Sequence, residues 1–487
     1  MQRASRLFRL ALVALWIVLL GDLVWQQRRA PSSPDRPEQD FVPAADAEDT
    51  WMGLYMNDRK LGYTHQRLSP EHDGYRFEEE SLLHLEVLGH LETVSAVAWG
   101  RTGSDFALQS FAMSLHSGVG SLEVEGSLQN HEMRLSMQTG GDASSTNVPM
   151  PGPVYLPGNA RLYVAHTGLQ QGREISVKVF DPSSLDSHDL RVTVAGREPL
   201  AVDGRTIDAW RIREEYHGVR SDVWLDPSGR AIREAGPMGL TAVRETGERA
   251  VAGLDSAGGL DLSDALAIRV DKPLGDARDL HRLMLRLDGI DDVAVPNDWR
   301  QSYDGGVLTI DREGNSTGSF TLPYDGAEWR SDLQRTPFLQ VDHPRVVAAA
   351  AEILEGETDA RRATDRLRSW VFQHLRKVPT ASIPNALQVL DMKEGDCNEH
   401  AVLLAALARA AGIPARIAAG AVYLDGKFLY HAWNEVWLGS QWVSLDAALD
   451  QMPVDATHIK LVEGGPETHA ALLPVMGRLK IEVVSAG

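Results

Sequence analysis

Three residues in the carboxy-terminal part of the chain have side chains that could perform nucleophilic catalysis. Cys397 is the single cysteine, so it cannot form an internal disulfide or supply a thiolate metal cluster, and buried apolar filler is its alternative role. His431 and Asp446 follow it. In such a set the imidazole takes the thiol proton, and the carboxylate fixes the imidazole tautomer. The residue types predict a nucleophile, a base and an orienting acid, with an acyl-thioester intermediate.

A predicted helix positions Cys397 for this role. The stretch CNEHAVLLAALARAA begins at Cys397 and stops at Gly412, and Pro414 follows as a further stop signal. Apolar residues cover most of its surface, which predicts the buried central helix of a domain. A thiol in the first turn lies at the positive end of the helix dipole, so we expect its pKa to fall below about 8.5.

Three predicted strands bring the other two side chains together. They cover residues 415–424, 428–438 and 442–446. Two-residue turns separate them, and if residues 438 and 441 flank the second turn, Trp433 lies opposite Asp446. His431 is then the diagonal neighbour of Asp446, about 7–8 Å away at the backbone and within side-chain reach. A register slip of one residue would separate them.

A metal site is the competing interpretation of the histidines. His400 lies about one helical turn after Cys397 and could join it and His431 as a ligand, but no dense set of histidines and cysteines supports zinc. We therefore expect no metal and no cofactor, and we expect His400 to pack or to form a hydrogen bond at the helix start. Glu399 and Glu435 are candidate acids of the site wall or the surface. The aromatics that we expect to pack on the sheet are Trp433, Trp437 and Trp442, and Trp433 could also border the acyl site.

The motifs around these residues resemble the transglutaminase-like superfamily of papain-fold cysteine enzymes. The matching segments are GDCNEHAVLLAALARAAGIPAR, YHAWNEVWL, WVSLDA and VDATHIKL, within residues 342–487. The resemblance implies that Cys397 is the nucleophile, His431 the base and Asp446 the orienting acid. The family often has Asp-Pro-Thr at the third motif, whereas Ala447 and Ala448 follow the acid here, which leaves the shape of that loop open. The Cys397 amide is a natural oxyanion donor, and Gln388 is a further candidate.

The catalytic domain is expected over residues 335–487, with more helices before Cys397. Stretches rich in Ala, Arg and Leu predict helices over 344–354 and 359–376, and a short helix is expected over 385–392. Upstream, short apolar runs predict a small β domain over 258–326. Its expected strands cover 265–270, 283–287, 307–310 and 320–322.

A β-rich domain is predicted over residues 51–250. Alternating apolar residues separated by turn signals favour an antiparallel half-barrel or sandwich. The opening WMGLYMNDRKLGYTHQRL and the hairpin near DVWLDPSGRAIREA resemble the β region of some exported bacterial transglutaminase-like proteins, whose half-barrel is similar to lipoprotein-carrier domains. That resemblance implies either an apolar or peptide ligand or a plain spacer, and we favour the spacer.

The amino terminus predicts export. An unbroken apolar run over residues 10–20 follows three arginines, and no small-x-small cleavage pattern comes after it, so we favour a transmembrane signal anchor over residues 1–29. A cleaved signal is the alternative. Residues 30–50 are rich in proline, serine and acids, which predicts a disordered linker. By resemblance to bacterial proteins, we expect one inner-membrane helix with the bulk of the chain in the periplasm.

Length, composition and charge complete the prediction of a multidomain α+β protein. The 487 residues are too many for one ordinary domain, and 43% hydrophobic residues suit folded cores. A formal charge of −20 disfavours a nucleic-acid partner. The expected partner is a protein or peptide substrate whose amide, peptide or isopeptide bond is attacked, with hydrolysis favoured over cross-linking. A catalytically silent transglutaminase-like scaffold, used for binding or assembly, is the alternative. The sequence leaves the oligomeric state open.

Overall fold

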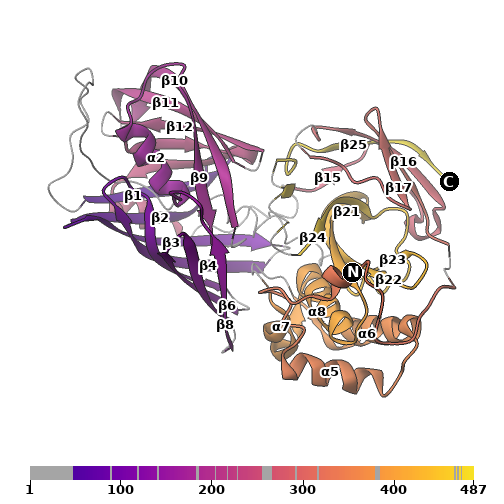
Figure 1. Cartoon of the computed structure of the whole chain (residues 1–487). Helices are drawn as coiled ribbons and strands as arrows, with labels where there is room; N and C mark the ends of the chain where they lie inside the picture. Colours follow the sequence, from indigo (N-terminus) through magenta and orange to yellow (C-terminus); the bar gives the residue numbers. More distant parts are fainter. Residues whose placement is uncertain are drawn as a thin grey trace.

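The structure is a computed structural model in which a β domain precedes an α+β part (Figure 1). It describes residues 48–487 apart from 88–89, 118–119, 140–141, 183–185, 203, 217, 227–228, 255–265, 291–292, 315–316, 379–383, 466–467, 469–470 and 473. The predicted membrane segment 1–29 and most of the predicted linker lie outside the described residues. Within them, no helix has the length and apolar character needed to cross a membrane.

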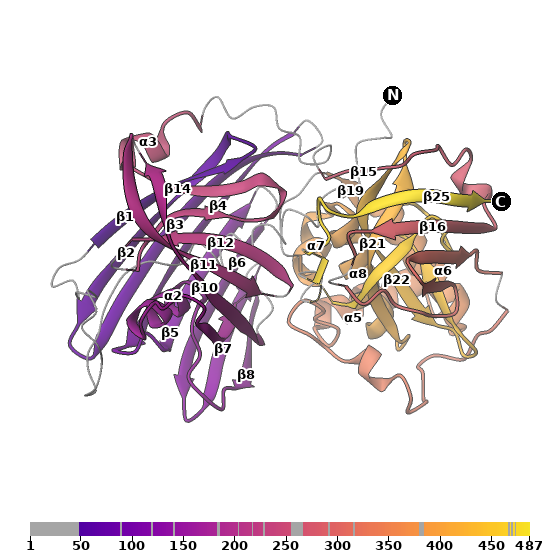
Figure 2. The same cartoon turned by 90° about the horizontal axis from the view of Figure 1, so that it is seen from above.

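The amino-terminal domain is a 14-stranded antiparallel sheet in the order β8-β7-β6-β5-β4-β3-β2-β1-β14-β13-β12-β11-β10-β9. The strands are β1 (Glu48–Met56), β2 (Arg59–Glu71), β3 (Gly74–Val87), β4 (His90–Gly103), β5 (Leu108–Ser117), β6 (Gly120–Gln129), β7 (Glu132–Thr139), β8 (Asp142–Pro149), β9 (Glu174–Asp181), β10 (Asp186–Val202), β11 (Arg205–Tyr216), β12 (Val219–Leu225), β13 (Ala231–Ala235) and β14 (Leu240–Glu245). The sheet curves around helix α2 (Pro157–His166), and α3 (Gly247–Val251) ends the domain (Figures 1 and 2). The half-barrel is therefore the correct one of the two predicted architectures. Because β1 begins at Glu48, the predicted linker extends three residues too far.

A charged side chain of α2 is buried inside this half-barrel. The Arg161 Nε atom lies 2.7 Å from Glu214 Oε1, and its Nη1 atom lies 2.6 Å from Glu234 Oε1. All three side chains are less than a tenth exposed. Burial raises the pKa of Glu234, although the charge of Arg161 opposes that change. The guanidinium thus compensates two carboxylates that are held away from water.

Replacing Arg161 by methionine should destabilise the β domain, because the two carboxylates would lose their buried partner. We expect the free energy of unfolding to fall by about 3 kcal/mol, measured by urea unfolding. The matched control is Lys178→Met, because Lys178 pairs with Asp189 where both side chains are 54% exposed. That change should cost less than about 1 kcal/mol. Equal effects of the two substitutions would contradict the expectation.

The carboxy-terminal part contains the predicted helices and strands. The helices are α5 (Pro344–Leu354), α6 (Ala360–His374), α7 (Ala386–Met392) and α8 (Cys397–Ala410). Asp359 and Asn385 cap α6 and α7 through their side chains. The sheet has the order β15-β22-β21-β24, and β23 also pairs with β22. These strands are β15 (Ile268–Arg269), β21 (Ala415–Leu424), β22 (Lys427–Trp437), β23 (Trp442–Leu445) and β24 (Ile459–Gly464).

The small β unit contains other strands than the sequence predicted. Its sheet has the order β17-β18-β16-β25, so a strand from the end of the chain completes it. The strands are β16 (Arg282–Asp288), β17 (Gln301–Asp304), β18 (Val307–Asp311) and β25 (Lys480–Ala486). β15 belongs to the sheet that contains β21 and β22, and the predicted strand over 320–322 makes a single isolated bridge, from Thr321 to Asp359. The predicted domain limits 258–326 and 335–487 therefore separate β25 from the other strands of its sheet. A local sequence pattern does not reveal which distant strand pairs with an open sheet edge.

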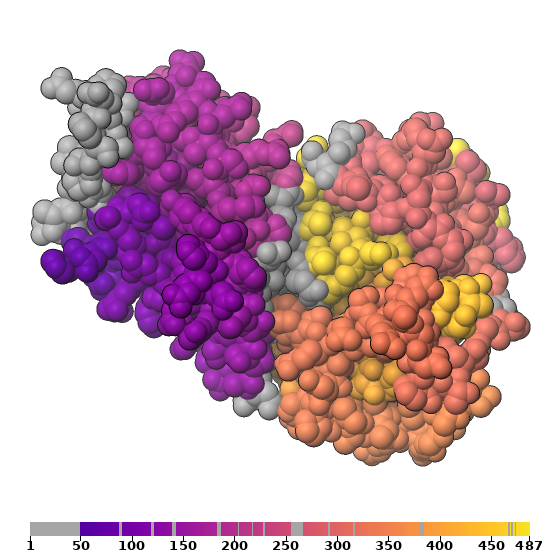
Figure 3. Space-filling view, viewed as in Figure 1, coloured from indigo at the N-terminus to yellow at the C-terminus, as the bar shows by residue number. Residues whose placement is uncertain are grey.

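The sheet that contains β21 and β22 lies between α5–α8 on one side and the small β sheet on the other (Figure 1). In the space-filling view, yellow carboxy-terminal residues lie between the salmon residues of the small unit and the orange helices (Figure 3). The short remaining elements are β19 (Arg376–Lys377), which pairs in parallel with β20 (Glu394–Gly395), and the 3₁₀ helices η1 (Pro237–Gly239), η3 (Ala277–Asp279) and η4 (Arg330–Leu333).

Candidate active site

Cys397 is the first residue of α8, and the start of that helix sets its surroundings. Asp396 caps the helix by accepting a hydrogen bond from the Asn398 amide at 2.8 Å. Glu399 accepts one from the Asp396 amide at 2.8 Å, which completes a capping box. Helix α8 packs against β22, where the Ala432 amide lies against the Cys397 sulfur. The thiol is thus fully buried beside the residue that follows His431.

The structure corrects the expected acidity of this thiol. Burial raises the pKa of Cys397 well above its usual value, and the charge of Asp396 raises it further. The Ala432 amide acts in the opposite direction. The prediction from the helix dipole was wrong because burial removes the solvation of a thiolate, and because the same helix start carries the carboxylates of Asp396 and Glu399.

His431 and Asp446 meet as the strand register requires. Asn434 pairs with Leu445 across β22 and β23, which confirms the register predicted from the turn. His431 Nε2 lies 2.6 Å from Asp446 Oδ2, and both side chains are buried. A carboxylate can only accept, so Nε2 carries the hydrogen and the lone pair of the neutral ring is on Nδ1.

The free nitrogen of His431 is the atom that could act as a base. Nδ1 is buried and has no hydrogen-bond partner among the described residues. Burial lowers the pKa of His431 from its ordinary 6.5, although Asp446 opposes that change, so the ring is neutral at pH 7. Burial therefore favours a neutral thiol and a neutral imidazole over a thiolate-imidazolium pair.

Asp446 is fixed by four donors. Its Oδ1 accepts hydrogen bonds from the amides of Ala448 at 2.6 Å and Leu449 at 3.0 Å. Its Oδ2 faces His431 and also His458, whose Nε2 lies 3.2 Å away. Burial alone would raise the pKa of Asp446, but the two histidines lower it far below its usual value. The Ala448 amide supplies a contact to the acid, so the loop holds Asp446 despite its departure from Asp-Pro-Thr.

His458 and Asp455 are site residues that the sequence reasoning missed. His458 Nδ1 lies 3.2 Å from Asp455 Oδ1, so the ring bridges the carboxylates of Asp455 and Asp446. Burial lowers the pKa of His458, but these carboxylates outweigh it and raise the pKa above the usual value. The available signal was the VDATHIKL motif, which carries both residues and which we used only for the resemblance.

A possible metal site coincides with this hydrogen-bonded group. The ligand atoms of His431, Asp446 and His458 lie within 4.8 Å of one another. Two histidines and a carboxylate are a suitable donor set for zinc, but the 2.6 Å contact between His431 and Asp446 is a hydrogen-bond length. His400 is not part of the group. Its Nδ1 donates to the Asp396 carbonyl oxygen, as expected at a helix start, and burial lowers its pKa to about 4.

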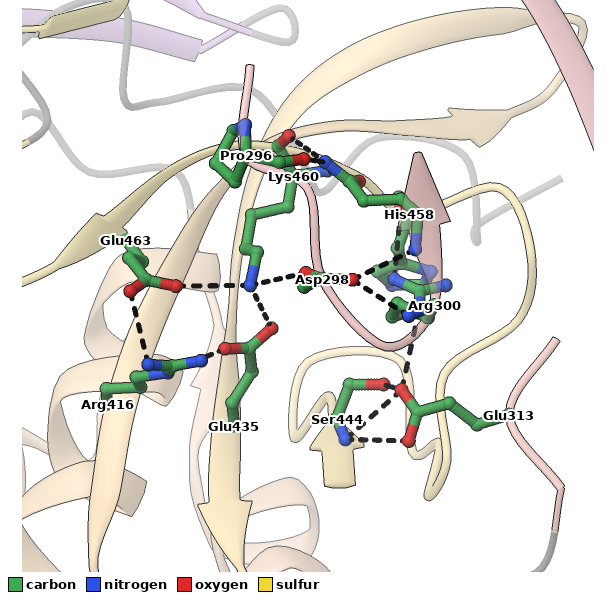
Figure 4. Close-up of polar contacts among 11 residues, drawn as sticks. Pro296, Asp298, Arg300, Glu313, Arg416, Glu435, Ser444, His458, Lys460 and Glu463 are labelled. Carbon is green, nitrogen blue, oxygen red and sulfur yellow. Dashed lines mark hydrogen bonds and ion pairs between the residues drawn. The ribbon is translucent and has the colours of Figure 1, made fainter. Parts of the chain in front are cut away.

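The remaining predicted residues are buried, and their roles in catalysis stay predictions. Gln388 lies in the first turn of α7, where its Oε1 accepts a hydrogen bond from Asn385. Glu435 is not a surface acid, because it is buried and paired with Lys460 and Arg416 (Figure 4). Trp433 packs beside the site, with its ring centroid 5.2 Å from that of His458.

Comparisons with known proteins agree with the site motifs. Residues 347–447 match the family model described as the transglutaminase-like superfamily. The matched segment includes Cys397, His431 and Asp446. The carboxy-terminal domain is therefore transglutaminase-like over those residues. No curated protein matches the sequence.

Three solved structures show weak similarity. A protein from Cytophaga hutchinsonii, described as a candidate cysteine protease, has 17% identity and a TM-score of 0.29, covering 41% of this chain and 83% of its own. A β-barrel-like protein with a domain of unknown function from Brucella abortus has 10% identity and a TM-score of 0.33, covering 40% and 94%. A Pseudomonas aeruginosa protein from another family of unknown function has 13% identity and a TM-score of 0.22, covering 42% and 95%. These scores are too low to carry a structural argument.

Proposed function

From the transglutaminase-like core at residues 347–447, we propose that this chain is a thiol-dependent acyl-transfer enzyme. Its substrates are amide, peptide or isopeptide bonds of proteins or peptides. The observation that carries the proposal is the His431–Asp446 hydrogen bond of 2.6 Å, on the strand that packs against the helix beginning at Cys397. Asp446 accepts the Nε2 hydrogen of His431, so the basic nitrogen of the ring is Nδ1. The Ala432 amide holds the Cys397 sulfur next to the residue that follows His431.

The proposed reaction uses the three side chains in sequence. His431 Nδ1 takes the Cys397 proton while the sulfur attacks the acyl carbon, which forms a tetrahedral oxyanion. The imidazolium then gives this proton to the leaving nitrogen, so the amine departs and a thioester remains. Water next attacks the thioester with His431 again as the base, which releases the carboxylic acid and restores the thiol. An amine in place of water would give a new amide.

Hydrolysis is the outcome that we propose. Because Cys397 is completely buried, the acceptor that reaches the thioester most easily is the smallest one, which is water. The two outcomes are separated by mass spectrometry, since hydrolysis adds one water to the products and transfer adds the acceptor amine. The reaction would take place in the periplasm if residues 1–29 anchor the chain as their sequence predicts.

A catalytically silent scaffold is the second candidate, because the burial that raises the pKa of Cys397 also suits an inert thiol. Iodoacetamide labelling separates the two, and the single cysteine makes the label specific. In an active site, His431→Ala should slow labelling of the folded protein by about 100-fold, because the thiol loses its base. His374→Ala, which removes an exposed histidine, should leave the rate unchanged. A wild-type thiol that reacts only after unfolding would identify the silent scaffold.

The pH dependence of turnover follows from the state of His431. The base must be unprotonated, and burial lowers its pKa below the ordinary 6.5. We therefore expect the acid limb of kcat/KM to lie below pH 6.5, with activity continuing into the alkaline range because the pKa of Cys397 is raised. The measurement is kcat/KM against pH at constant ionic strength. An acid limb above pH 6.5 would contradict a neutral resting pair.

A further inference from the structure

A second hydrogen-bonded pair lies directly behind the acid of the triad. His458 is completely buried and places one ring nitrogen 3.2 Å from Asp446 and the other 3.2 Å from Asp455. An imidazole can donate from both nitrogens only when it is protonated. The geometry therefore gives an alternating row in which neutral His431 is followed by anionic Asp446, cationic His458 and anionic Asp455.

Asp455 is itself firmly held, so it can fix the position of His458. Its Oδ1 accepts hydrogen bonds from the Thr457 amide at 2.9 Å and the Thr457 hydroxyl at 2.6 Å. Its Oδ2 accepts one from Gln451 Nε2 at 2.8 Å. The backbone of Gln451 also pairs with that of Asp446 in both directions, at 2.9 and 3.0 Å. The two carboxylates therefore belong to one closed loop.

The small β unit holds this loop from outside. Arg300, directly before β17, donates to the carbonyl oxygen of His458 at 2.9 Å (Figure 4). It also donates to the carbonyl oxygen of Asp455 at 2.8 Å. Glu313 pairs with Arg300 at 3.5 Å and accepts a hydrogen bond from the Ser444 amide on β23, two residues before Asp446. The two segments that carry Asp446 and His458 are thus held by one buried ion pair.

We propose that His458, held by Asp455 and Arg300, is a positioning residue that acts through Asp446 on the base His431. The inference rests on the proposed function and extends it beyond residues 347–447, where the family match ends. With Oδ1 bound to two amides and Oδ2 bound by His458, the Asp446 carboxylate has one orientation in which to receive the His431 hydrogen. His458 also places a positive charge near His431, which disfavours a second proton on the base.

The contact lengths favour this role over a metal site. Both histidine Nε2 atoms point at the same oxygen, at 2.6 and 3.2 Å, which are hydrogen-bond lengths. The titratable groups that influence His458 are Asp446 and Asp455, and His431 is its ring neighbour at 5.7 Å between centroids. Zinc content of the purified protein tests the metal alternative directly.

The first test needs no variant. In the full-length wild-type protein labelled with ¹⁵N-histidine, both ring nitrogens of His458 should have imidazolium shifts at pH 7, while His431 should be neutral with its hydrogen on Nε2. A neutral His458 at pH 7 would overturn the proposal. So would one tightly bound zinc per chain that is lost on substitution of His458.

The second test compares His458→Gln and Asp455→Asn, of which the latter keeps the ring but removes the charge that keeps it protonated. Both should slow iodoacetamide labelling of Cys397 by roughly tenfold, at the lower end of what outer hydrogen-bond partners contribute at metal sites. His458→Gln should also move the His431 titration to higher pH, because a like charge is lost. The shift should be smaller in Asp455→Asn, because that change also removes a carboxylate that raises the pKa of His431. The control is Tyr430→Phe, which removes a buried hydrogen bond to the Val475 carbonyl from the strand that carries His431. It should leave the His431 titration unchanged.

Failure of this inference can be told apart from failure of the proposed function. If His431→Ala slows labelling but neither outer variant shifts the His431 titration, His458 has no positioning role and the triad stands. If His431→Ala has no effect on labelling, the proposed function fails, and the positioning role fails with it.

Discussion

Replacing Cys397 by alanine should reduce acyl transfer by at least about 10⁴-fold, because the reaction then has no atom that can form the thioester. The fold should persist, since an alanine fills most of the buried space at the start of α8. The assay compares wild-type and Cys397→Ala proteins on envelope protein extracts, with new carboxyl termini or new amide links identified by mass spectrometry. Fragments that only the wild type produces would also identify the substrate.

The Cys397→Ala result is informative only beside a variant that leaves the thiol in place. Val402→Ala, in the buried body of α8, removes apolar volume from the same helix and keeps the sulfur. It should lower the free energy of unfolding by about 1 kcal/mol or more and preserve turnover. Equal product formation by wild-type and Cys397→Ala proteins would show that the reaction does not proceed through this thiol.

Replacing Asp446 by asparagine should have the second-largest effect, a loss of about 10⁴-fold in kcat. The Ala448 and Leu449 amides both donate to Oδ1, so the asparagine must place its carbonyl oxygen there. Its NH₂ group then faces His431 Nε2 and donates to it. The ring hydrogen moves to Nδ1, and the nitrogen that we propose takes the Cys397 proton ceases to be a base.

The position of the hydrogen makes this prediction specific. The ¹⁵N shifts of His431 should report a hydrogen on Nδ1 in Asp446→Asn and on Nε2 in the wild type. Asp450→Asn is the matched control, because Asp450 lies in the same loop but pairs with Arg368 at the surface. It should change neither the tautomer nor the rate. If Asp446→Asn retained turnover and kept the His431 hydrogen on Nε2, Asp446 would not be the residue that orients the ring.

Local signals in the sequence predicted much of the secondary structure of the carboxy-terminal domain. Helix α5 and strand β21 have the predicted limits, because a proline in a first turn and two-residue turns are decided by neighbours in the chain. The cap residues Asp359 and Asn385 mark where α6 and α7 begin for the same reason. The short turn before Trp442 also fixed the β22–β23 register, and with it the pairing of His431 with Asp446.

Contacts between segments far apart in the chain could not be predicted from local sequence patterns. The predicted limits of the small β unit missed β25, because an open strand edge accepts any partner of suitable shape. Arg300 and Glu313 belong to no motif, and their contacts with the segments that carry Asp446 and His458 form only because β17 and β18 lie against those segments. The predicted acidity of Cys397 was wrong because burial depends on the whole domain.

By itself, the sequence determined which side chains could do the chemistry and which local elements carry them, since residue type, capping and turn geometry are properties of short segments. The tertiary structure alone decided their charge states. Burial raises the pKa of Cys397 and lowers that of His431. The carboxylates of Asp446 and Asp455, on loops that the small β unit holds in place, raise the pKa of His458. Electrostatic free energies inside a protein depend on distance and burial in three dimensions, and neither quantity is written in the order of residues along the chain.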